Sequence, residues 1–212
     1  MEAGLKACKK GNALINSVSL QTSRIDLGLE LAAKYEAEVI ALLWSDQGMP
    51  RDANERAMHI VDFMQKATEH GVTTDKLWFD PIVSPISVEV NQVKACVECM
   101  GMLKDIAPDA KSTCGLSNVS NGVPDALRPW LNITYLIMLI KNGLHSAIVD
   151  AFDDDLTDVI TGKKDKIVKL VHGILDGEKV DINSLSEVES KYVKTVKVLT
   201  GESLFSDSWL EI

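Results

Sequence analysis

The chain has 212 residues and a net charge of −9 at neutral pH, and 46% of its residues are hydrophobic. This length can form one domain with a sizeable core, and the acidic balance without a basic stripe argues against a nucleic-acid-binding protein. No apolar segment approaches the roughly 20 residues that span a membrane, and the N-terminal sequence MEAGLKACKK lacks the features of a secretory signal. We therefore expect a cytoplasmic protein with neither a membrane nor a nucleic acid as partner.

Six short apolar segments are typical of strands that are buried on both faces of a parallel sheet. In chain order, these predicted strands are residues 13–17, 38–44, 76–80, 112–117, 146–150 and 203–206. Between them, apolar residues recur at helical spacing and predict helices over about residues 23–36, 52–71, 88–105, 130–142, 167–177 and 188–201. Strands that alternate with helices predict an α/β fold with parallel strands, either a doubly wound sheet or a barrel. No segment resembles a linker, so we predict a single domain over residues 1–212.

Two of the four cysteines, Cys96 and Cys99, form a C-x-x-C pair, a motif that can serve redox chemistry or bind a metal ion. The pair lies inside VNQVKACVECMGML, where apolar residues recur at helical spacing. A redox pair normally opens a helix, and no second pair of cysteines or histidines completes a zinc site. Because free cysteine is usually buried, we predict structural thiols and no bound metal.

Polar side chains lie at or just after the end of each predicted strand. They are Asn16, Asp46, Asp80, Asn118, Asp150 and Asp207. In a barrel these positions gather at one rim, where the active site of such folds lies. Asp and Asn are also common turn and capping residues, which is the simpler interpretation of any single one. Taken together, amides and carboxylates with almost no Lys or Arg favour a neutral heterocycle over a phosphate as ligand.

Several motifs together resemble those of one known family. They are Leu14-Ile15-Asn16-Ser17, Phe79-Asp80-Pro81, Thr113-Cys114-Gly115-Leu116-Ser117-Asn118-Val119-Ser120, Arg128 with Leu131-Asn132, and Ser206-Asp207-Ser208. The chain is similar to the methyltetrahydrofolate:corrinoid protein methyltransferases. These belong to the pterin-binding superfamily, with dihydropteroate synthase and the folate module of cobalamin-dependent methionine synthase. The resemblance implies a TIM-type (β/α) barrel.

The resemblance also implies which residues hold the pterin ring. Asn16 and Asp80 match family residues that bind the ring, and Arg128 matches a family arginine nearby. Asn118 matches the asparagine that hydrogen-bonds the methylated ring nitrogen, and Asn121 stands where relatives often carry glutamine. We assign the strand-end residue Asp46 to the same pterin-binding set.

The activity implied by the resemblance is transfer of a methyl group between methyltetrahydrofolate and the cobalt of a corrinoid, a cobalamin-type cofactor carried by a partner protein. Asn118 would be the catalytic residue, because its hydrogen bond strengthens as the ring nitrogen gains positive charge. The family is commonly dimeric, so we expect a homodimer or a complex with the corrinoid protein.

The chain departs from the family pattern in two places. Relatives have two further strands before the segment where this sequence begins, so we expect an N-terminally truncated barrel with about six of eight strands. A helical insertion is expected at about residues 153–192. Two alternatives stay open: a dihydropteroate-synthase-like enzyme, disfavoured because its basic groups are absent, and a non-catalytic remnant that only self-associates or binds a corrinoid protein.

Overall fold

The structure, a computed structural model, describes residues 1–211 and divides them into two compact units. Unit 1 comprises Met1–Ile82, Glu98–Cys114 and Gly143–Ser146, and unit 2 comprises Val83–Val97, Gly115–Asn142 and residues 147–211. None of the helices within these described residues is long and apolar enough to cross a membrane.

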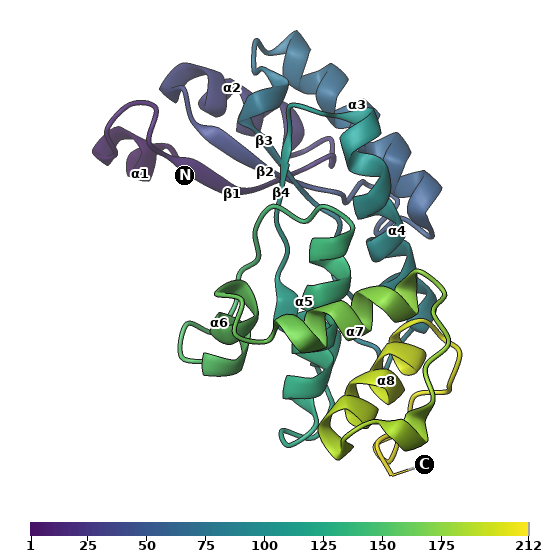
Figure 1. Ribbon diagram of the computed structural model, residues 1–212. Coiled ribbons are helices and arrows are strands. Elements are labelled where there is room, and N and C mark those ends of the chain that lie inside the picture. The colour runs from purple at the N-terminus through teal and green to yellow at the C-terminus, as the bar shows by residue number, and fades with distance from the viewer. Residues whose placement is uncertain (212) are drawn as a thin grey trace. The chain divides into compact units, whose positions relative to one another are not determined.

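Unit 1 is built on a parallel sheet, as the sequence predicts (Figure 1). Its strands follow chain order as β1 (Leu14–Ser19), β2 (Glu38–Leu42), β3 (Leu77–Asp80) and β4 (Lys111–Ser112). Its helices are α1 (Glu2–Ala7), α2 (Ile25–Tyr35), α3 (Ala53–Glu69) and the second half of α4 (Val90–Ile106). Asp52 caps α3 by accepting a hydrogen bond from the Glu55 amide, which confirms the predicted start of that helix.

The two faces of this sheet differ. Phe79 and Val18 lie on the face that α3 and α2 cover: the Phe63 and Phe79 rings meet edge to face at 6.2 Å, and Val18 touches α2 at Gly28. A Cβ atom added to Gly28 would lie 2.6 Å from the Val18 methyl carbons, so this close approach requires glycine. Successive side chains alternate between faces, so Trp78 and Asp80 lie on the opposite face from Phe79.

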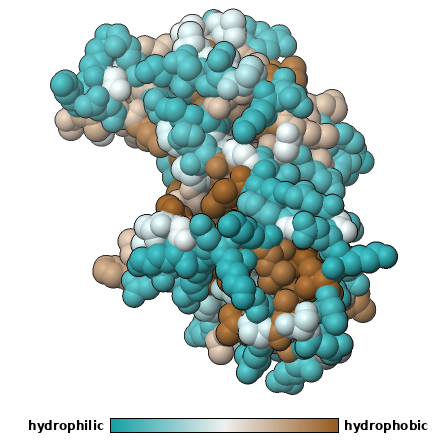
Figure 2. Space-filling view, viewed as in Figure 1, coloured by the Kyte–Doolittle hydropathy of each residue, from teal (hydrophilic) through white to brown (hydrophobic). Residues whose placement is uncertain are grey.

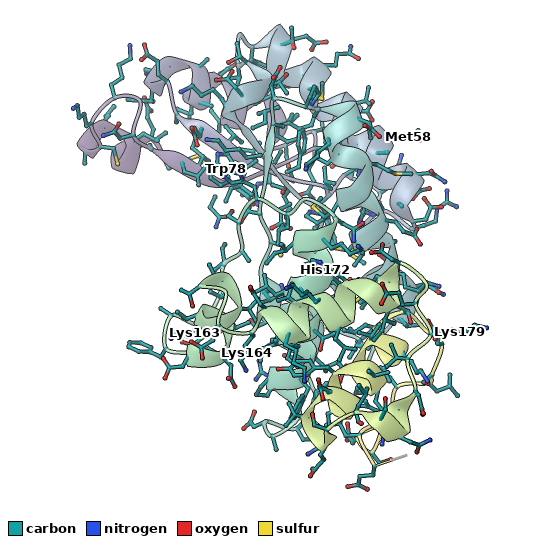
Figure 3. The ribbon with its side chains drawn as sticks, viewed as in Figure 1. Met58, Trp78, Lys163, Lys164, His172 and Lys179 are labelled. Atoms are coloured by element: carbon teal, nitrogen blue, oxygen red, sulfur yellow. The ribbon has the colours of Figure 1, made fainter. Side chains whose placement is uncertain are left out.

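A polar network occupies the start of this second face. The Trp78 indole donates a hydrogen bond to the Glu38 carboxylate at 2.5 Å, and the Lys111 ammonium lies 3.2 Å from the same carboxylate. The Lys111 ammonium also lies over the Trp78 ring, 4.6 Å from its centroid. Figure 3 labels Trp78 in unit 1.

Unit 2 is mainly helical. It contains the first half of α4, α5 (Arg128–Lys141), α6 (Asp154–Ile160), α7 (Asp165–Leu175) and α8 (Glu187–Leu199). Helix α5 packs against α6, α7 and α8, and its residues from Leu131 to Leu139 are almost all buried. Ser186 and Glu189 form a complete capping box at the start of α8. In Figure 2, hydrophobic residues are visible over α7 on an otherwise largely hydrophilic face.

The predicted insertion at about 153–192 coincides with α6, α7 and the beginning of α8. Asp153 accepts a hydrogen bond from the Leu156 amide and caps α6. Lys163 and Lys164, both labelled in Figure 3, form ion pairs with Asp158 and Asp155 at 2.7 and 2.6 Å. The acidic residues here therefore serve as a cap and as ion-pair partners.

The last two predicted strands differ from the structure. Of residues 146–150, only Ile148 forms a bridge, which is parallel and pairs with Gly115. The strand prediction for 203–206 is wrong, because these residues pair with no other strand in the described part of the chain. Leu204 is 93% exposed, and the Phe205 ring packs against the Trp209 ring with 5.6 Å between their centroids. The predicted strand 112–117 is also shorter, because a 3₁₀ helix, η2 (Leu116–Ser120), begins inside it.

The predicted buried thiols are confirmed. Cys96 and Cys99 lie inside α4 and are fully buried, as is Cys114 after β4. Within residues 1–211, no three or more His, Cys, Asp or Glu side chains are grouped so as to bind a metal ion.

Candidate functional site

Asp80 is the best-defined polar residue at the carboxyl end of the sheet. It is the last residue of β3, and its Oδ1 accepts a hydrogen bond from the Ile82 amide at 2.8 Å. Ile82 has φ of +64°, so the chain turns sharply right after the strand. Burial raises the pKa of Asp80 to about 6, although the Ile82 hydrogen bond opposes this shift. Asp80 is therefore a half-buried carboxylate fixed by its own turn.

Asn16 lies on the same face of the sheet as Asp80. The ladder pairs Asn16 with Ile40 and Ile40 with Trp78, which places Asn16 level with a residue two positions before Asp80. Two strand spacings and two residue rises put their Cα atoms roughly 12 Å apart. The Asn16 side chain is exposed, and a bulge at Ser17 interrupts the ladder after it. Two side chains at this separation can contact opposite edges of one bicyclic ring.

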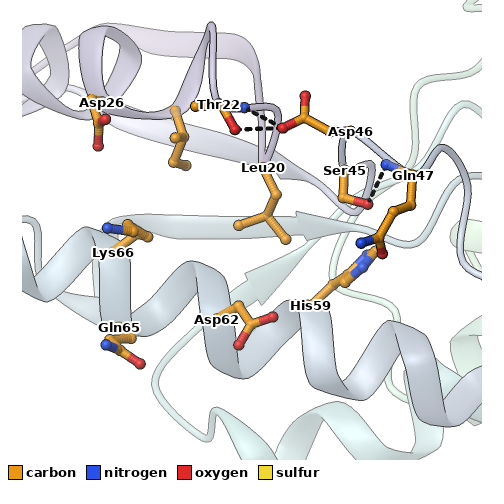
Figure 4. Close-up of a pocket in the computed structure, with 11 residues that line it drawn as sticks. Leu20, Thr22, Asp26, Ser45, Asp46, Gln47, His59, Asp62, Gln65 and Lys66 are labelled. Carbon is orange, nitrogen blue, oxygen red and sulfur yellow. Dashed lines mark hydrogen bonds between the residues drawn. The ribbon is translucent and has the colours of Figure 1, made fainter.

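Asp46 lies in a different environment. Its Oδ2 accepts hydrogen bonds from the amide and the hydroxyl of Thr22. Both hydrogen bonds lower the pKa of Asp46, and the one from the hydroxyl has the larger effect. The residue lines a groove of about 450 Å³ into which His59 and Asp62 project from α3 (Figure 4). Neither Asn16 nor Asp80 lines this groove. The structure thus does not group Asp46 with the other two residues of unit 1.

In unit 2, Asn118 and Asn121 are brought together by η2. The Asn121 side-chain amide donates a hydrogen bond to the Asn118 Oδ1 at 3.2 Å. The Asn118 Nδ2 lies 3.1 Å from the point where a Cβ atom on Gly115 would stand, so glycine leaves room for that amide. Both asparagines are exposed to solvent. This arrangement gives an amide whose oxygen is held and whose nitrogen remains available as a donor.

Arg128 is tied to the same segment through a buried serine. Its Nε donates a hydrogen bond to the Ser120 Oγ at 3.2 Å, and Ser120 in turn donates to the Ser117 carbonyl at 3.1 Å. Arg128 begins α5 and lines a cavity of about 310 Å³ with Ser117, Asn132 and Asp150. The predicted unit 2 residues thus form one connected group.

One residue near Asp80 is absent from the sequence-based set. Arg56, in α3, is the largest fully buried side chain among the described residues, and its Nε donates a hydrogen bond to the Pro81 carbonyl at 2.9 Å. The sequence does indicate that Arg56 is buried, because it falls in helical register with the apolar residues Ile60, Phe63 and Ala67. A charged residue on the apolar face of a helix marks a buried polar contact.

The chemistry of these groups is that of neutral hydrogen-bond recognition. A carboxylate such as Asp80 accepts two parallel hydrogen bonds, and a side-chain amide offers both donors and acceptors. A pyrimidinone edge with adjacent N–H, amino and carbonyl groups requires such partners.

Comparison with known proteins gives the family of the chain. Residues 1–150 match the pterin binding enzyme family. The chain belongs to this family. It is 26% identical over 162 residues to the methylcorrinoid:tetrahydrofolate methyltransferase of Eubacterium limosum, a match that covers 76% of this chain and 59% of that protein.

Two methionine synthases are also similar over nearly the same length. The protein from Mycobacterium tuberculosis is 30% identical over 161 residues, and that from Mycobacterium leprae is 29% identical over 161 residues. Each match covers 71% of this chain and 13% of the methionine synthase. The chain thus spans less than two thirds of the length of these relatives.

Proposed function

We propose that the chain binds methyltetrahydrofolate by its pterin ring and transfers a methyl group between this folate and the cobalt of a corrinoid protein. The observation that carries the proposal is Asp80, a half-buried carboxylate at the carboxyl end of the sheet in a pterin binding family member. The choice of reaction is supported by the similarity of the chain to a methylcorrinoid:tetrahydrofolate methyltransferase.

In the binding step, Asp80 accepts hydrogen bonds from the pterin amino group and the adjacent ring N–H. Its Oδ1 already accepts one from the Ile82 amide, and Oδ2 has no hydrogen-bond partner within residues 1–211. Asn16, on the same face, supplies a donor and an acceptor to the pyrimidinone edge. Arg128 and Asn121 complete the pterin-binding set, and we include Asp46 in it as a more distant polar residue.

In the chemical step, the bond from the methyl carbon to the ring nitrogen breaks and its electron pair stays on nitrogen, so this nitrogen must take up a proton from solvent as the methyl group leaves. The Asn118 amide hydrogen-bonds this nitrogen and stabilises the transition state, because a hydrogen bond to a group that gains charge is stronger in the transition state than in the ground state. The contact between Asn121 and the Asn118 Oδ1 holds the Asn118 amide in one orientation. The corrinoid, when presented by its protein, supplies the cobalt that donates or accepts the methyl group.

The proposed partners follow from the size of that cofactor. A corrinoid bound to another protein must approach the carboxyl end of the strands face on. We also propose a homodimer, supported by large apolar side chains exposed in the last third of the chain: Phe152, Ile160, Val188 and Leu204. A reducing, cytoplasmic location is supported by the buried free thiols.

We further propose that the parallel strands of unit 1 belong to a (β/α) barrel and that residues 1–212 act as one domain. The support is that α2 and α3 cover the Phe79 face, while the opposite face carries Asn16 and Asp80. In a (β/α) barrel the helices lie outside and the inner face holds the strand-end site residues.

A folate titration tests the proposal. The purified 212-residue chain is titrated with 5-methyltetrahydrofolate by calorimetry, and Asp80→Asn is compared with Asp109→Asn, an exposed aspartate outside the site. We expect saturable binding that Asp80→Asn weakens and Asp109→Asn does not. Methyl transfer is then followed by the visible spectrum of a reduced corrinoid protein.

The possible outcomes distinguish the proposed function from its alternatives. Saturable folate binding without methyl transfer would favour a binding protein over an enzyme. Condensation of a pterin diphosphate with p-aminobenzoate would favour the dihydropteroate-synthase-like alternative. Absence of saturable folate binding would contradict the proposed function and favour the non-catalytic alternative.

A further inference from the structure

Arg56 connects helix α3 to the turn that follows Asp80. The Arg56 guanidinium donates one hydrogen bond to the Pro81 carbonyl at 2.9 Å and another to the Asp52 carbonyl at 3.3 Å. Pro81 is itself buried and directly follows Asp80. One side chain therefore joins the first turn of α3 to the backbone just after the strand.

Burying a guanidinium without water is costly unless its N–H groups are hydrogen-bonded. Arg56 is fully buried, whereas a leucine or methionine at this position would continue the apolar face formed by Ile60 and Phe63 at no such cost. A buried charge that contacts backbone carbonyls fixes the geometry of those carbonyls. The geometry fixed here is that of the residue next to Asp80.

The turn itself needs such a restraint. Ile82 adopts φ of +64°, a conformation that is unfavourable for a β-branched residue. The same turn presents the Ile82 amide to the Asp80 Oδ1 at 2.8 Å. If Pro81 is released, Ile82 can relax to negative φ, and its amide then leaves Asp80.

We infer that Arg56 is a positioning residue: by holding the Pro81 carbonyl, it keeps Asp80 in the orientation that receives the pterin ring. The inference rests on the proposed function for the ligand, but the geometry that it concerns lies wholly within unit 1.

The test compares Arg56→Met, which retains the side-chain volume without donors, with Arg56→Lys, which retains the charge without the planar fork. Arg51→Met is the matched control, since Arg51 lies just before the same helix with its side chain 86% exposed. Circular dichroism first checks that each variant is folded. We expect the dissociation constant for 5-methyltetrahydrofolate to rise about tenfold in both Arg56 variants and to stay unchanged in Arg51→Met.

A double-mutant cycle with Asp80→Asn separates positioning from a general loss of structure. If Arg56 acts through Asp80, then Arg56→Met should weaken folate binding by less than about twofold when Asp80 is already asparagine. An equal loss in both backgrounds would overturn the inference, as would unchanged binding in folded Arg56→Met.

A measurement without folate keeps the inference independent of the proposed function. Hydrogen–deuterium exchange of the Ile82 amide is followed by NMR in the wild type and in Arg56→Met. Release of the turn breaks the hydrogen bond from this amide to the Asp80 Oδ1, so the amide should exchange about tenfold faster or more in Arg56→Met. This result would support the inference even if no folate binds, and unchanged protection of the Ile82 amide would overturn it.

Discussion

The two units carry their candidate site residues in opposite ways. In unit 1, Asp80 is half-buried, fixed by the Ile82 amide and titrates with a pKa raised to about 6. In unit 2, Asn118 lies in the short 3₁₀ helix η2 and Asn121 directly follows it, and these exposed amides contact one another. A desolvated, fixed carboxylate suits recognition of the pterin amino and ring N–H groups, whose charge changes little during the reaction. An exposed amide with a free donor suits a step in which charge develops. This difference supports our proposal that Asp80 of unit 1 mainly holds the pterin ring and that Asn118 of unit 2 acts in the chemical step.

The largest effect is expected for Asp80→Asn. Loss of a charge-assisted pair costs about 1.5–3 kcal/mol, so folate should bind roughly ten- to a hundredfold more weakly. Calorimetry measures this change, with Asp109→Asn as the control. Unchanged affinity would contradict a binding role for unit 1.

The same substitution should also change the dependence of stability on pH. Because the pKa of Asp80 is raised in the folded protein, this carboxyl favours folding at low pH, and that contribution is lost as the pH rises from about 4 to about 6. Above pH 6 the ionised group destabilises the fold by up to about 3 kcal/mol. Asp80→Asn should therefore melt at a higher temperature than the wild type at pH 7.5, and the difference should shrink toward pH 4.

Gly28→Ala tests the packing that supports the unit 1 residues. The added methyl group would lie 2.6 Å from the Val18 side chain, so we expect a loss of about 2 kcal/mol in the free energy of unfolding. Gly4→Ala is the matched control, because no heavy atom lies within 4 Å of its added Cβ. Denaturant unfolding measures both variants. Equal stabilities would show that α2 can shift on the sheet.

Asn118→Ala tests the unit 2 half of the comparison. We expect the single-turnover rate of methyl transfer to fall about tenfold while the folate dissociation constant changes less. Rapid mixing with a reduced corrinoid protein measures the rate, and calorimetry measures the affinity. If folate binding is greatly weakened while the rate at saturating folate is intact, the two units have the reverse roles.

The smallest effect is expected for Asn121→Ala. This change removes the donor to the Asn118 Oδ1 but leaves Asn118 in place, so the single-turnover rate should fall by only about threefold. Asn183→Ala, an exposed amide on another short helix, is the control. A loss as large as that of Asn118→Ala would mean that Asn121 itself contacts the reacting nitrogen.

Local patterns in the sequence predict much of unit 1. The apolar runs locate β1, β2 and β3 within about two residues, and the Asp52 and Glu55 pattern locates the start of α3. The strand predicted at 203–206 does not form, because a strand needs a neighbouring strand to pair with and Phe205 packs on Trp209 instead. A four-residue apolar run carries no information about that long-range choice.

The site is predictable to a similar extent. Motif resemblance identifies Asp80, but the raised pKa depends on burial by residues distant in sequence. Arg56 is missed because a charged residue is read as solvent-facing, and only the register with Ile60 and Phe63 indicates otherwise. The separation of Asp46 from Asn16 and Asp80 depends on its contact with Thr22, which no spacing rule specifies.

Strand β1 ends the order β1-β2-β3-β4, so one of its edges has no ladder partner among residues 1–211. In a parallel ladder, the amide groups of a strand point alternately to its two sides. Hydrogen–deuterium exchange along residues 14–19 should therefore alternate between slow amides that face β2 and fast amides that face outward, with a break in the alternation at the Ser17 bulge. Any strand added at that edge, from whatever polypeptide, would slow the fast set alone. The exchange pattern of six residues thus reports directly on whether this sheet is complete.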